Sequence, residues 1–243
     1  MERTAVLFVL LSFCITSLAL ECKVVPGSVK QIDVWNGIVY GVNSNNQILA
    51  LFKQWLKLEG SWKHVSVGPA GTWGVNANNR ICKNVGGRWI QFKDLMKQID
   101  AGGKYIAGVN MNNEFMCISE SSSWTIIPEK LKYVSCGPYS CWGVNAADNI
   151  FILKGLTPTA CGGSLKFEKI PGSLSMIDVS TDGKVFGVNS NGDVYQRDGV
   201  SQSNPVGTGW RQVPSSKKVK HVSYGNGHLW LIGRDDSIMD CSE

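Results

Sequence analysis

Five asparagines recur at equivalent places in this chain, and their side chains are the ones best suited to hold a polar ligand. Each follows a Gly-Val pair, and the five are Asn43, Asn76, Asn110, Asn145 and Asn189. A primary amide both donates and accepts hydrogen bonds, so it can pair with the hydroxyl and acetamido groups of a sugar. Asn also closes tight hairpins, because it tolerates positive φ. The pattern favours the hairpin role for any one of them and leaves sugar binding as a hypothesis.

Two aromatic residues extend this candidate chemistry, because the apolar side of a sugar ring can pack on an aromatic face. Trp35 and Tyr139 each follow the first strand expected in their repeats, and we expect both to lie in loops, where binding residues gather. A second aromatic set stands directly before the glycine of Gly-Val-Asn or its counterpart: Tyr40, Trp73, Trp142, Phe186 and Trp230. Its regular placement predicts packing between neighbouring repeats.

Motifs for catalysis are scarce. The chain has three histidines, His64, His221 and His228, and it lacks the His-Glu-x-x-His pattern of zinc hydrolases. Ser180-Thr181-Asp182-Gly183 is similar to the Asp-box turn of sialidases, but it occurs once and fits a hairpin. We therefore expect a binding protein and not an enzyme, with a glycoside hydrolase as the alternative.

These candidate residues are carried by six copies of one unit. Gly-Val-Asn starts at Gly41, Gly74, Gly108, Gly143 and Gly187, at spacings of 33, 34, 35 and 44 residues, and an altered sixth copy reads Leu231-Ile232-Gly233. Upstream of each copy lies a stretch of similar pattern that starts at Lys30, Lys63, Lys97, Lys132, Ser175 and Lys220. Periods of this length are typical of repeat folds.

Each repeat predicts four short strands, because apolar and polar residues alternate and turn residues separate the runs. Asn-rich hairpins divide the second and third strands, and residues 26–28, 128–129, 171–173 and 214–216 mark turns after the fourth. No run has the period of a helix, so we expect an all-β six-bladed β-propeller of four-stranded blades, formed by residues 20–243 as one domain. The last repeat stops after its third strand, so the strand that starts at Cys22 must complete that blade and close the ring.

The first strands carry acids and serines in alternation. Asp33, Asp100 and Asp178 fall in odd-numbered repeats, and Ser66, Ser135 and Ser223 fall at the same position in even-numbered ones. First strands of a propeller lie nearest the axis, so we expect these side chains to line the channel or bond one another. An ion held there is the alternative.

The cysteines predict disulfides. Seven follow residue 19, and their odd number leaves at least one unpaired. Cys22 takes the place of an aromatic residue of a fourth strand and Cys241 falls on the adjacent strand, which predicts that they pair. Cys136 and Cys141 flank a turn, and Cys117 and Cys161 lie in neighbouring blades. Cys82 is left over, although a bond between Cys82 and Cys117 is a real alternative.

The N-terminal residues 1–19 are typical of a secretory signal peptide. Arg3 precedes an apolar run from Ala5 to Ile15, and Ser17-Leu18-Ala19 fits a cleavage site. An uncleaved anchor is the alternative, although the run is short for a membrane span, and no other stretch approaches that length. The net charge of +5 comes without a run of five basic residues, which disfavours nucleic acid as a partner.

The repeated aromatic-Gly-Val-Asn, with its upstream Lys-x-Ile-Asp-Val and Pro-Gly-Ser, resembles the tectonin-repeat lectins and most closely the fish egg lectins. The resemblance covers residues 22–241. It implies a secreted propeller that binds N-acetylglucosamine-containing glycans, chitin oligomers and bacterial lipopolysaccharide, with a role in innate or egg defence. No cofactor is required, although calcium binding and a homodimer fit the family. Repeat six and the insertion at residues 155–164 depart from the pattern, and a secreted protein-binding propeller is a further alternative.

Overall fold

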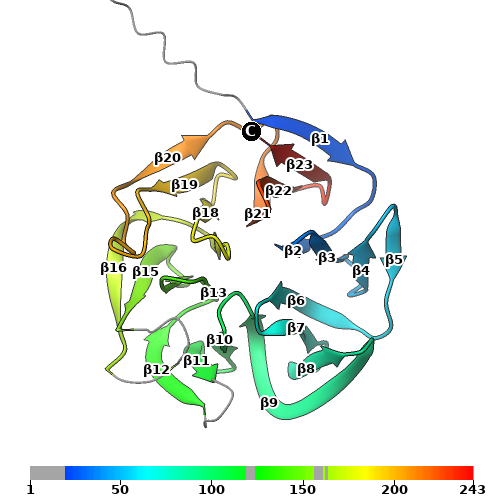
Figure 1. Ribbon diagram of the computed structural model, residues 1–243, viewed down its shortest axis with the longest axis horizontal. Helices are drawn as coiled ribbons and strands as arrows, with labels where there is room; N and C mark the ends of the chain where they lie inside the picture. Colours follow the sequence, from blue (N-terminus) through cyan, green and yellow to red (C-terminus); the bar gives the residue numbers. More distant parts are fainter. Residues whose placement is uncertain (1–19, 119–123, 156–160, 162–163, 243) are drawn as a thin grey trace, which may run out of the picture.

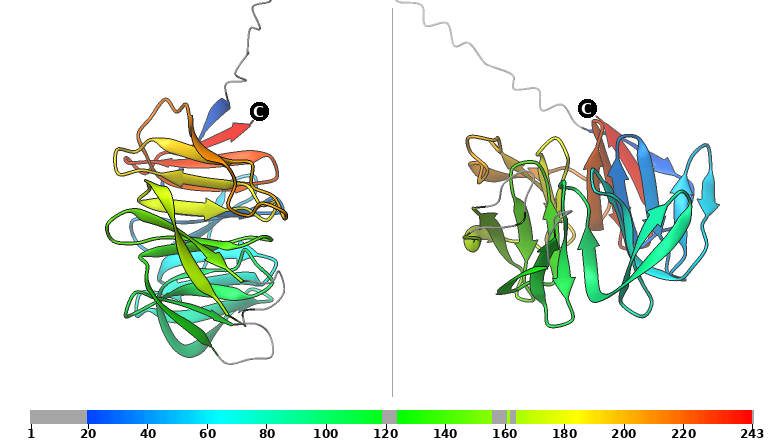
Figure 2. Two further views of the ribbon diagram at one scale, coloured as in Figure 1. Left: turned by 90° about the vertical axis from the view of Figure 1, so that its left-hand side faces the viewer. Right: turned by 60° about the horizontal axis from the view of Figure 1, so that its bottom comes forward.

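The chain is an all-β, propeller-like molecule. The computed structural model describes residues 20–118, 124–155, 161 and 164–242, which form 23 strands and no helix. Five antiparallel sheets stand around a central axis, with the first strand of each repeat innermost (Figure 1). Side views show the connecting loops gathered at the two faces (Figure 2). The signal peptide expected at residues 1–19 and most of the insertion at residues 155–164 lie outside the described residues.

Three repeats each form a four-stranded sheet of the predicted kind. Strands follow one another outward from the axis in sequence order. Their bounds are β2 (Gln31–Trp35), β3 (Ile38–Val42), β4 (Ile48–Leu51) and β5 (Trp55–Lys57) in repeat one; β13 (Tyr133–Cys136), β14 (Cys141–Val144), β15 (Asn149–Lys154) and β16 (Lys166–Ser173) in repeat four; and β17 (Met176–Val179), β18 (Val185–Val188), β19 (Val194–Asp198) and β20 (Gly209–Val213) in repeat five.

Repeats two and three share one strand and form a seven-stranded sheet. Its members are β6 (Trp62–Gly68), β7 (Gly71–Asn76), β8 (Arg80–Val85), β9 (Arg88–Asp100), β10 (Ile106–Asn110), β11 (Glu114–Ile118) and β12 (Thr125–Lys130). The first part of β9, up to Leu95, pairs with β8, and the part from Met96 onward pairs with β10. Residues 88–100 contain neither Pro nor Gly, so the chain bends from one repeat into the next without leaving the ladder.

The sixth repeat is completed by the start of the described chain. β21 (Val219–Gly225), β22 (His228–Gly233) and β23 (Ile238–Ser242) form a sheet with β1 (Glu21–Val25) as its outer strand. Cys22 stands opposite Cys241 in the β1–β23 register, and a disulfide joins them. The first and last described strands therefore lie side by side (Figure 1).

Two of the expected turns after fourth strands are bulges inside strands. Pro128 lies within β12 and the Pro171–Gly172 pair lies within β16. The register shifts at these points, because Phe115 pairs with Ile127 while Glu114 pairs with Lys130, and Ile150 pairs with Ile170 while Asn149 pairs with Ser173. A proline cannot donate to the ladder, and a bulge accommodates it without ending the strand.

The glycine of Gly-Val-Asn makes room for a side chain at or just before the start of the first strand. A Cβ at Gly74 would lie 2.9 Å from the Trp62 ring, and one at Gly143 would lie 2.7 Å from a methyl group of Leu131. The close contact at these two glycines is to a side chain of the same repeat. Extra atoms forced into such a contact cost about 1 to 3 kcal/mol.

The aromatic residues before that glycine pack between repeats, as expected. Trp142 contacts Trp210 of the next repeat edge-on, with 6.0 Å between ring centroids, and Phe186 stacks on Tyr224 at 5.0 Å. Trp230 of repeat six packs in one cluster with Val34 of repeat one. Tyr40 is half-buried, whereas the other members of the set are buried. These contacts join neighbouring sheets through apolar burial.

Candidate functional site

The five repeated asparagines hold the hairpins between second and third strands. In each, the side-chain Oδ1 accepts the backbone N–H groups of the second and fourth residues that follow, at 2.8 to 3.1 Å. Asn and Asp side chains commonly close turns in this way. The hairpin role is confirmed for all five, and their amide oxygens are occupied. Sugar binding by these residues stays a prediction, and the group they can offer is Nδ2.

The Nδ2 groups differ among the repeats. Asn43 donates to Gln47 Oε1 at 2.9 Å, Asn110 to Glu114 Oε2 at 3.0 Å, and Asn189 to Asp193 Oδ2 at 3.2 Å. At Asn76 and Asn145 this group has no partner among the described residues. The turns therefore have the same backbone hydrogen-bond pattern but carry different polar side chains.

A lysine at the start of the first strand binds the fourth residue of its own hairpin. Lys30 Nζ donates to Asn46 Oδ1 at 2.5 Å, Lys63 to Asn79 at 2.7 Å and Lys97 to Asn113 at 2.6 Å. Ion pairs replace these bonds in repeats four and six, between Lys132 and Asp148 and between Lys220 and Asp236. The hairpin residue has φ between 59° and 65° in all five cases, a conformation that Asn and Asp tolerate. Sequence reasoning missed these pairs, although their constant separation of 16 residues is a usable signal.

The same hairpin residue also bonds the next repeat. The carbonyl oxygen of Asn46 accepts the N–H of Trp62 at 2.7 Å, and that of Asn79 accepts the N–H of Met96 at 2.8 Å. Trp62 and Met96 directly precede Lys63 and Lys97. Equivalent bonds run from Leu131 to Asn113, from Leu174 to Asp148, from Val219 to Gly192 and from Val29 to Asp236. Hairpins and lysines together form a hydrogen-bonded belt on one face, which we call the turn belt.

A hollow of about 140 Å³ lies beside Asp193 on this belt, between repeats five and six. The residues that line it include Gln212, Ser215, Ser216 and Lys218. Asp193 Oδ1 accepts from Lys218 Nζ at 2.6 Å while Asn189 holds the other oxygen. These hydrogen bonds, that from Lys218 first, lower the pKa of Asp193, so the hollow presents an ionised carboxylate.

Trp35 and Tyr139, expected as ligand-facing loop aromatics, have different surroundings. Trp35 is the last residue of β2 and pairs with Ile38, so its expected place in a loop is wrong. Tyr139 lies in the loop between β13 and β14, as expected. Its ring covers Gly183 of the next repeat, where a Cβ would lie 2.2 Å from the ring. Tyr139 thus packs against the hairpin at Ser180–Gly183, which closes through a bond from Gly183 N to Ser180 O at 3.0 Å.

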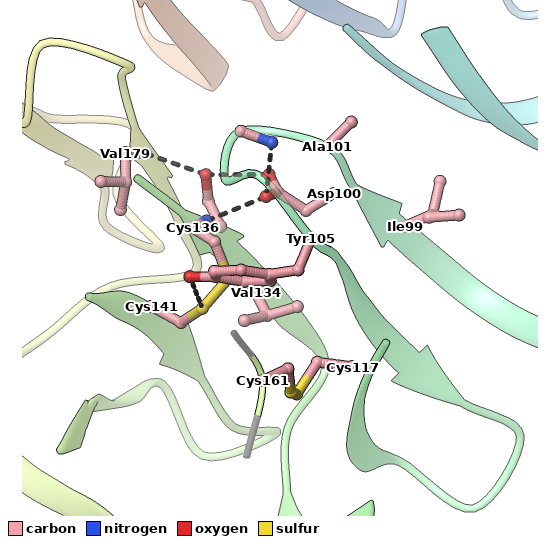
Figure 3. Close-up of a disulfide and its surroundings, with 12 residues drawn as sticks. Ile99, Asp100, Ala101, Tyr105, Cys117, Val134, Cys136, Cys141, Cys161 and Val179 are labelled. Atoms are coloured by element: carbon pink, nitrogen blue, oxygen red, sulfur yellow. Dashed lines mark hydrogen bonds between the residues drawn. A yellow bond between two sulfur atoms is a disulfide. The ribbon is translucent and has the colours of Figure 1, made fainter. Parts of the chain in front are cut away.

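The acids and serines of the first strands line the axis, as expected, and bind neighbouring repeats in turn. Asp100 Oδ2 accepts the N–H of Cys136 at 3.0 Å, and Ser135 Oγ accepts the N–H of Val179 at 2.9 Å (Figure 3). The other bonds of this kind run from Tyr224 N to Asp178, from Val34 N to Ser223, from Val67 N to Asp33 and from Ala101 N to Ser66. Taken in order, the six bonds return to the repeat where they begin.

Burial in this polar channel favours the neutral forms of its side chains. Burial raises the pKa of Asp100 to about 7 and raises the pKa values of Asp33 and Asp178. One layer away, the Tyr133 hydroxyl lies 3.1 Å from His64 Nε2 and 3.2 Å from His221 Nε2. Burial lowers the pKa of both histidines to about 3. Among the described residues, no group of three or more His, Cys, Asp or Glu side chains is arranged to hold a metal ion.

The structure joins the cysteines in the expected pairs. Disulfides link Cys22 to Cys241, Cys117 to Cys161 and Cys136 to Cys141. The last pair lies against Tyr105, whose hydroxyl is 3.4 Å from Cys141 Sγ (Figure 3). Cys82 is free and buried, so the alternative bond between Cys82 and Cys117 is wrong. No helix in the described part of the chain is long and apolar enough to cross a membrane.

Two solved structures with similar folds share little sequence with this chain. The β-propeller domain of Cps50 (Swd1) from Myceliophteria thermophila aligns with 92% of this chain and 100% of that chain, with a TM-score of 0.61 and 9% identity. A gluconolactonase from Xanthomonas campestris aligns with 92% of this chain and 86% of its own, with a TM-score of 0.63 and 9% identity. At such identity the likeness shows the fold alone.

Sequence comparison is more specific. The chain is 50% identical over 234 residues to a fish-egg lectin from Cyprinus carpio, which covers 91% of this chain and 98% of that lectin. The family model for the tectonin domain matches residues 28–234, which include the axial channel, the hollow beside Asp193 and all of the turn belt except Asp236. The chain therefore belongs to the tectonin family.

Proposed function

We propose that the protein is a secreted lectin without catalytic activity that binds N-acetylglucosamine-containing glycans. The carrying observation is the 50% identity to a fish-egg lectin over nearly its full length. Chitin oligomers and the polysaccharide of bacterial lipopolysaccharide are the ligands that the family resemblance suggests, and defence of the egg or innate immunity is the proposed role. Three disulfides fit an oxidising, extracellular compartment. The proposal includes no cofactor, although calcium and a homodimer fit the family resemblance.

We also propose that residues 20–243 form one six-bladed propeller closed by β1. The six Asp and Ser bonds around the axis support this count, since each joins one repeat to the next. The pairing of β1 with β23 supports closure. In this scheme β9 serves as the outer strand of one blade and the inner strand of the next.

The hollow beside Asp193 is the proposed sugar site. An ionised carboxylate accepts two hydrogen bonds from adjacent sugar hydroxyls, and Gln212, Ser215 and Ser216 add donors and acceptors around it. Lys218 and Asn189 fix the carboxylate in place, so little side-chain entropy is lost when a sugar binds. Equivalent hairpins in other repeats would multiply weak sites into strong attachment to a repetitive glycan surface.

The test is Asp193→Asn, measured by calorimetric titration with N-acetylglucosamine and chitotriose in the presence of EDTA. A hydrogen bond to a charged group contributes about 1.5 to 3 kcal/mol, so this site should weaken roughly ten- to hundredfold and the stoichiometry should fall. Asp198→Asn is the matched control, because Asp198 pairs with Arg211 and does not line the hollow. Unchanged affinity and stoichiometry in Asp193→Asn would place the sugar elsewhere.

A further inference from the structure

Three lysines on the turn belt stand in consecutive repeats without a negative partner. Lys30, Lys63 and Lys97 begin the first strands of repeats one to three, and we call them the lysine arc. Each binds the neutral amide of an asparagine, and none has an ion pair among the described residues. The belt lysines of repeats four and six, in contrast, are bonded to Asp148 and Asp236. Positive charge is therefore concentrated on one side of this face.

The belt holds the arc in a fixed arrangement. Asn46 accepts from Lys30 through its side chain and from the residue before Lys63 through its carbonyl, so one hairpin sets the spacing of two lysines. Asn79 does the same for Lys63 and Lys97. Burial lowers the pKa of Lys30, the charge of Asp236 opposes that shift, and the charges of Lys220 and Lys63 add to the lowering, so these lysines lie close enough to interact. Like charges held together in this way are a source of attraction for an anion.

Two acids of the belt, Asp236 and Glu114, are already engaged. Asp236 lies next to Lys30 in the belt, where its carbonyl bonds Val29, but its carboxylate is paired with Lys220. Glu114 follows the hairpin residue Asn113 and is paired with Lys130 at 3.2 Å. At the place equivalent to Glu114, repeats one and two have Gln47 and Arg80, so the arc gains a further positive charge and no acid there.

We propose that the lysine arc binds oxyanion esters, that is, phosphate or sulfate groups attached to a glycan. An ammonium group has three donors, and the bond to Asn uses one, which leaves two on each lysine for ester oxygens. Several ester groups along one glycan can contact several lysines at once, and avidity then makes the attachment firm. This inference does not depend on the sugar hollow of repeat five, because the arc recognises charge and the hollow recognises hydroxyls.

The experiment compares charged and uncharged glycans. Immobilised full-length protein is titrated with dextran sulfate and its parent dextran, and with phosphomannan and mannan, at low and high sodium chloride. We expect binding of the two charged polymers, loss of that binding at high salt, and no binding of dextran through the arc. Binding of only one charged polymer would identify which ester the arc accepts.

The variant K30Q/K63Q/K97Q should weaken binding of the charged polymers roughly tenfold or more, since it removes three positive charges that each attract the polymer modestly. K30R/K63R/K97R keeps the charge and should bind as the unmodified protein does, which separates charge from folding. K23Q/K57Q/K169Q makes the same charge change on outer strands and should have a small effect. Equal loss in this control, or full binding by K30Q/K63Q/K97Q, would overturn the proposal. Chitotriose titration of each variant reports separately on the sugar site.

Discussion

The turn belt uses two residue types at the hairpin position that binds the lysine, and they divide the belt into two sides. In repeats one to three, the hairpin residue that binds the lysine is Asn, and in repeats four and six it is Asp. The backbone is the same in both, with φ of 64° at Asn79 and 61° at Asp148. The hairpin needs a short side chain that tolerates this conformation and accepts one hydrogen bond. Its charge is free to vary, and that freedom lets one fold carry two kinds of surface.

Covalent cross-links follow a similar division, except that repeat three falls with the later repeats. One disulfide lies in repeat six, one lies in repeat four, and the third joins repeats three and four. Repeats one and two contribute Cys82, which is free and buried. The later repeats are thus tied by disulfides and ion pairs, whereas the first two rely on apolar packing and neutral hydrogen bonds. Three perturbations test how much this difference matters.

The largest effect should follow removal of the disulfide between β1 and β23. Its cysteines are 219 residues apart, and in the chain-entropy model such a link adds about 5 kcal/mol to the free energy of unfolding. We expect Cys22→Ser with Cys241→Ser to lose a large part of that amount in denaturant titration. Cys136→Ser with Cys141→Ser opens a loop with a separation of 5 and should lose about 2 kcal/mol. Equal losses would mean that local packing, and not loop length, decides the contribution.

Early and late repeats both contribute residues to the axial channel. A change in the channel should therefore affect the stability of both groups of repeats. The pKa of Asp100 is raised to about 7, so the folded protein holds its proton more tightly than the unfolded chain does. The free energy of unfolding should therefore fall as pH rises from about 4 to 7, by at most about 4 kcal/mol. His64 and His221 act oppositely, because their lowered pKa values weaken the fold as pH falls below about 6.5.

Asp100→Asn isolates the aspartate contribution. Denaturant titrations across pH 4 to 8 should show a smaller decline in the variant than in the unmodified protein, because the histidines are common to both. Parallel curves would show that Asp100 keeps an ordinary pKa. Ser135, which donates to Asp100 Oδ1 at 3.2 Å, remains in place in both proteins.

The smallest effect on stability, and the sharpest test of the comparison, comes from exchanging the hairpin residues. Asp148→Asn should lose less than about 1 kcal/mol, the usual contribution of an exposed ion pair, and should extend the lysine arc by freeing Lys132. Asn79→Asp should pair with Lys63 and weaken binding of sulfated dextran. Thermal unfolding and polymer titration measure the two effects. Opposite shifts in polymer binding are expected, and shifts in one direction would contradict the assignment of charge to the belt.

The sequence allows most of the fold to be predicted, because the repeat restates each local rule several times. Gly-Val-Asn places a hairpin five times, and the missing strand of repeat six leaves β1 with one partner, β23. The disulfide between Cys22 and Cys241 follows from that register. The channel residues could also be placed, since alternation along a first strand assigns Asp100 and Ser135 to the same layer.

Other features of the fold and the site could not be predicted, because no sequence motif marks them. β9 is continuous because residues 88–100 contain neither Pro nor Gly. A missing turn residue is a weaker signal in a sequence than a repeated motif. The sequence predicts a turn at Pro128, whereas the structure has a β-bulge there and β12 continues through it. The sequence predicts a loop at Trp35, whereas the structure extends β2 to this residue because only Asn36 and Gly37 separate it from β3. The hollow beside Asp193 lies between two repeats, so the sequence pattern of one repeat does not predict it.

The continuous strand β9 also governs how the molecule opens. Its backbone hydrogen bonds belong to repeat two at one end and to repeat three at the other, so neither repeat can release its strand alone. Sub-global opening in proteins occurs in contiguous cooperative units. Repeats two and three should therefore exchange their amide hydrogens as one unit. Unfolding that starts in another repeat would have to disrupt repeats two and three together in order to spread past β9.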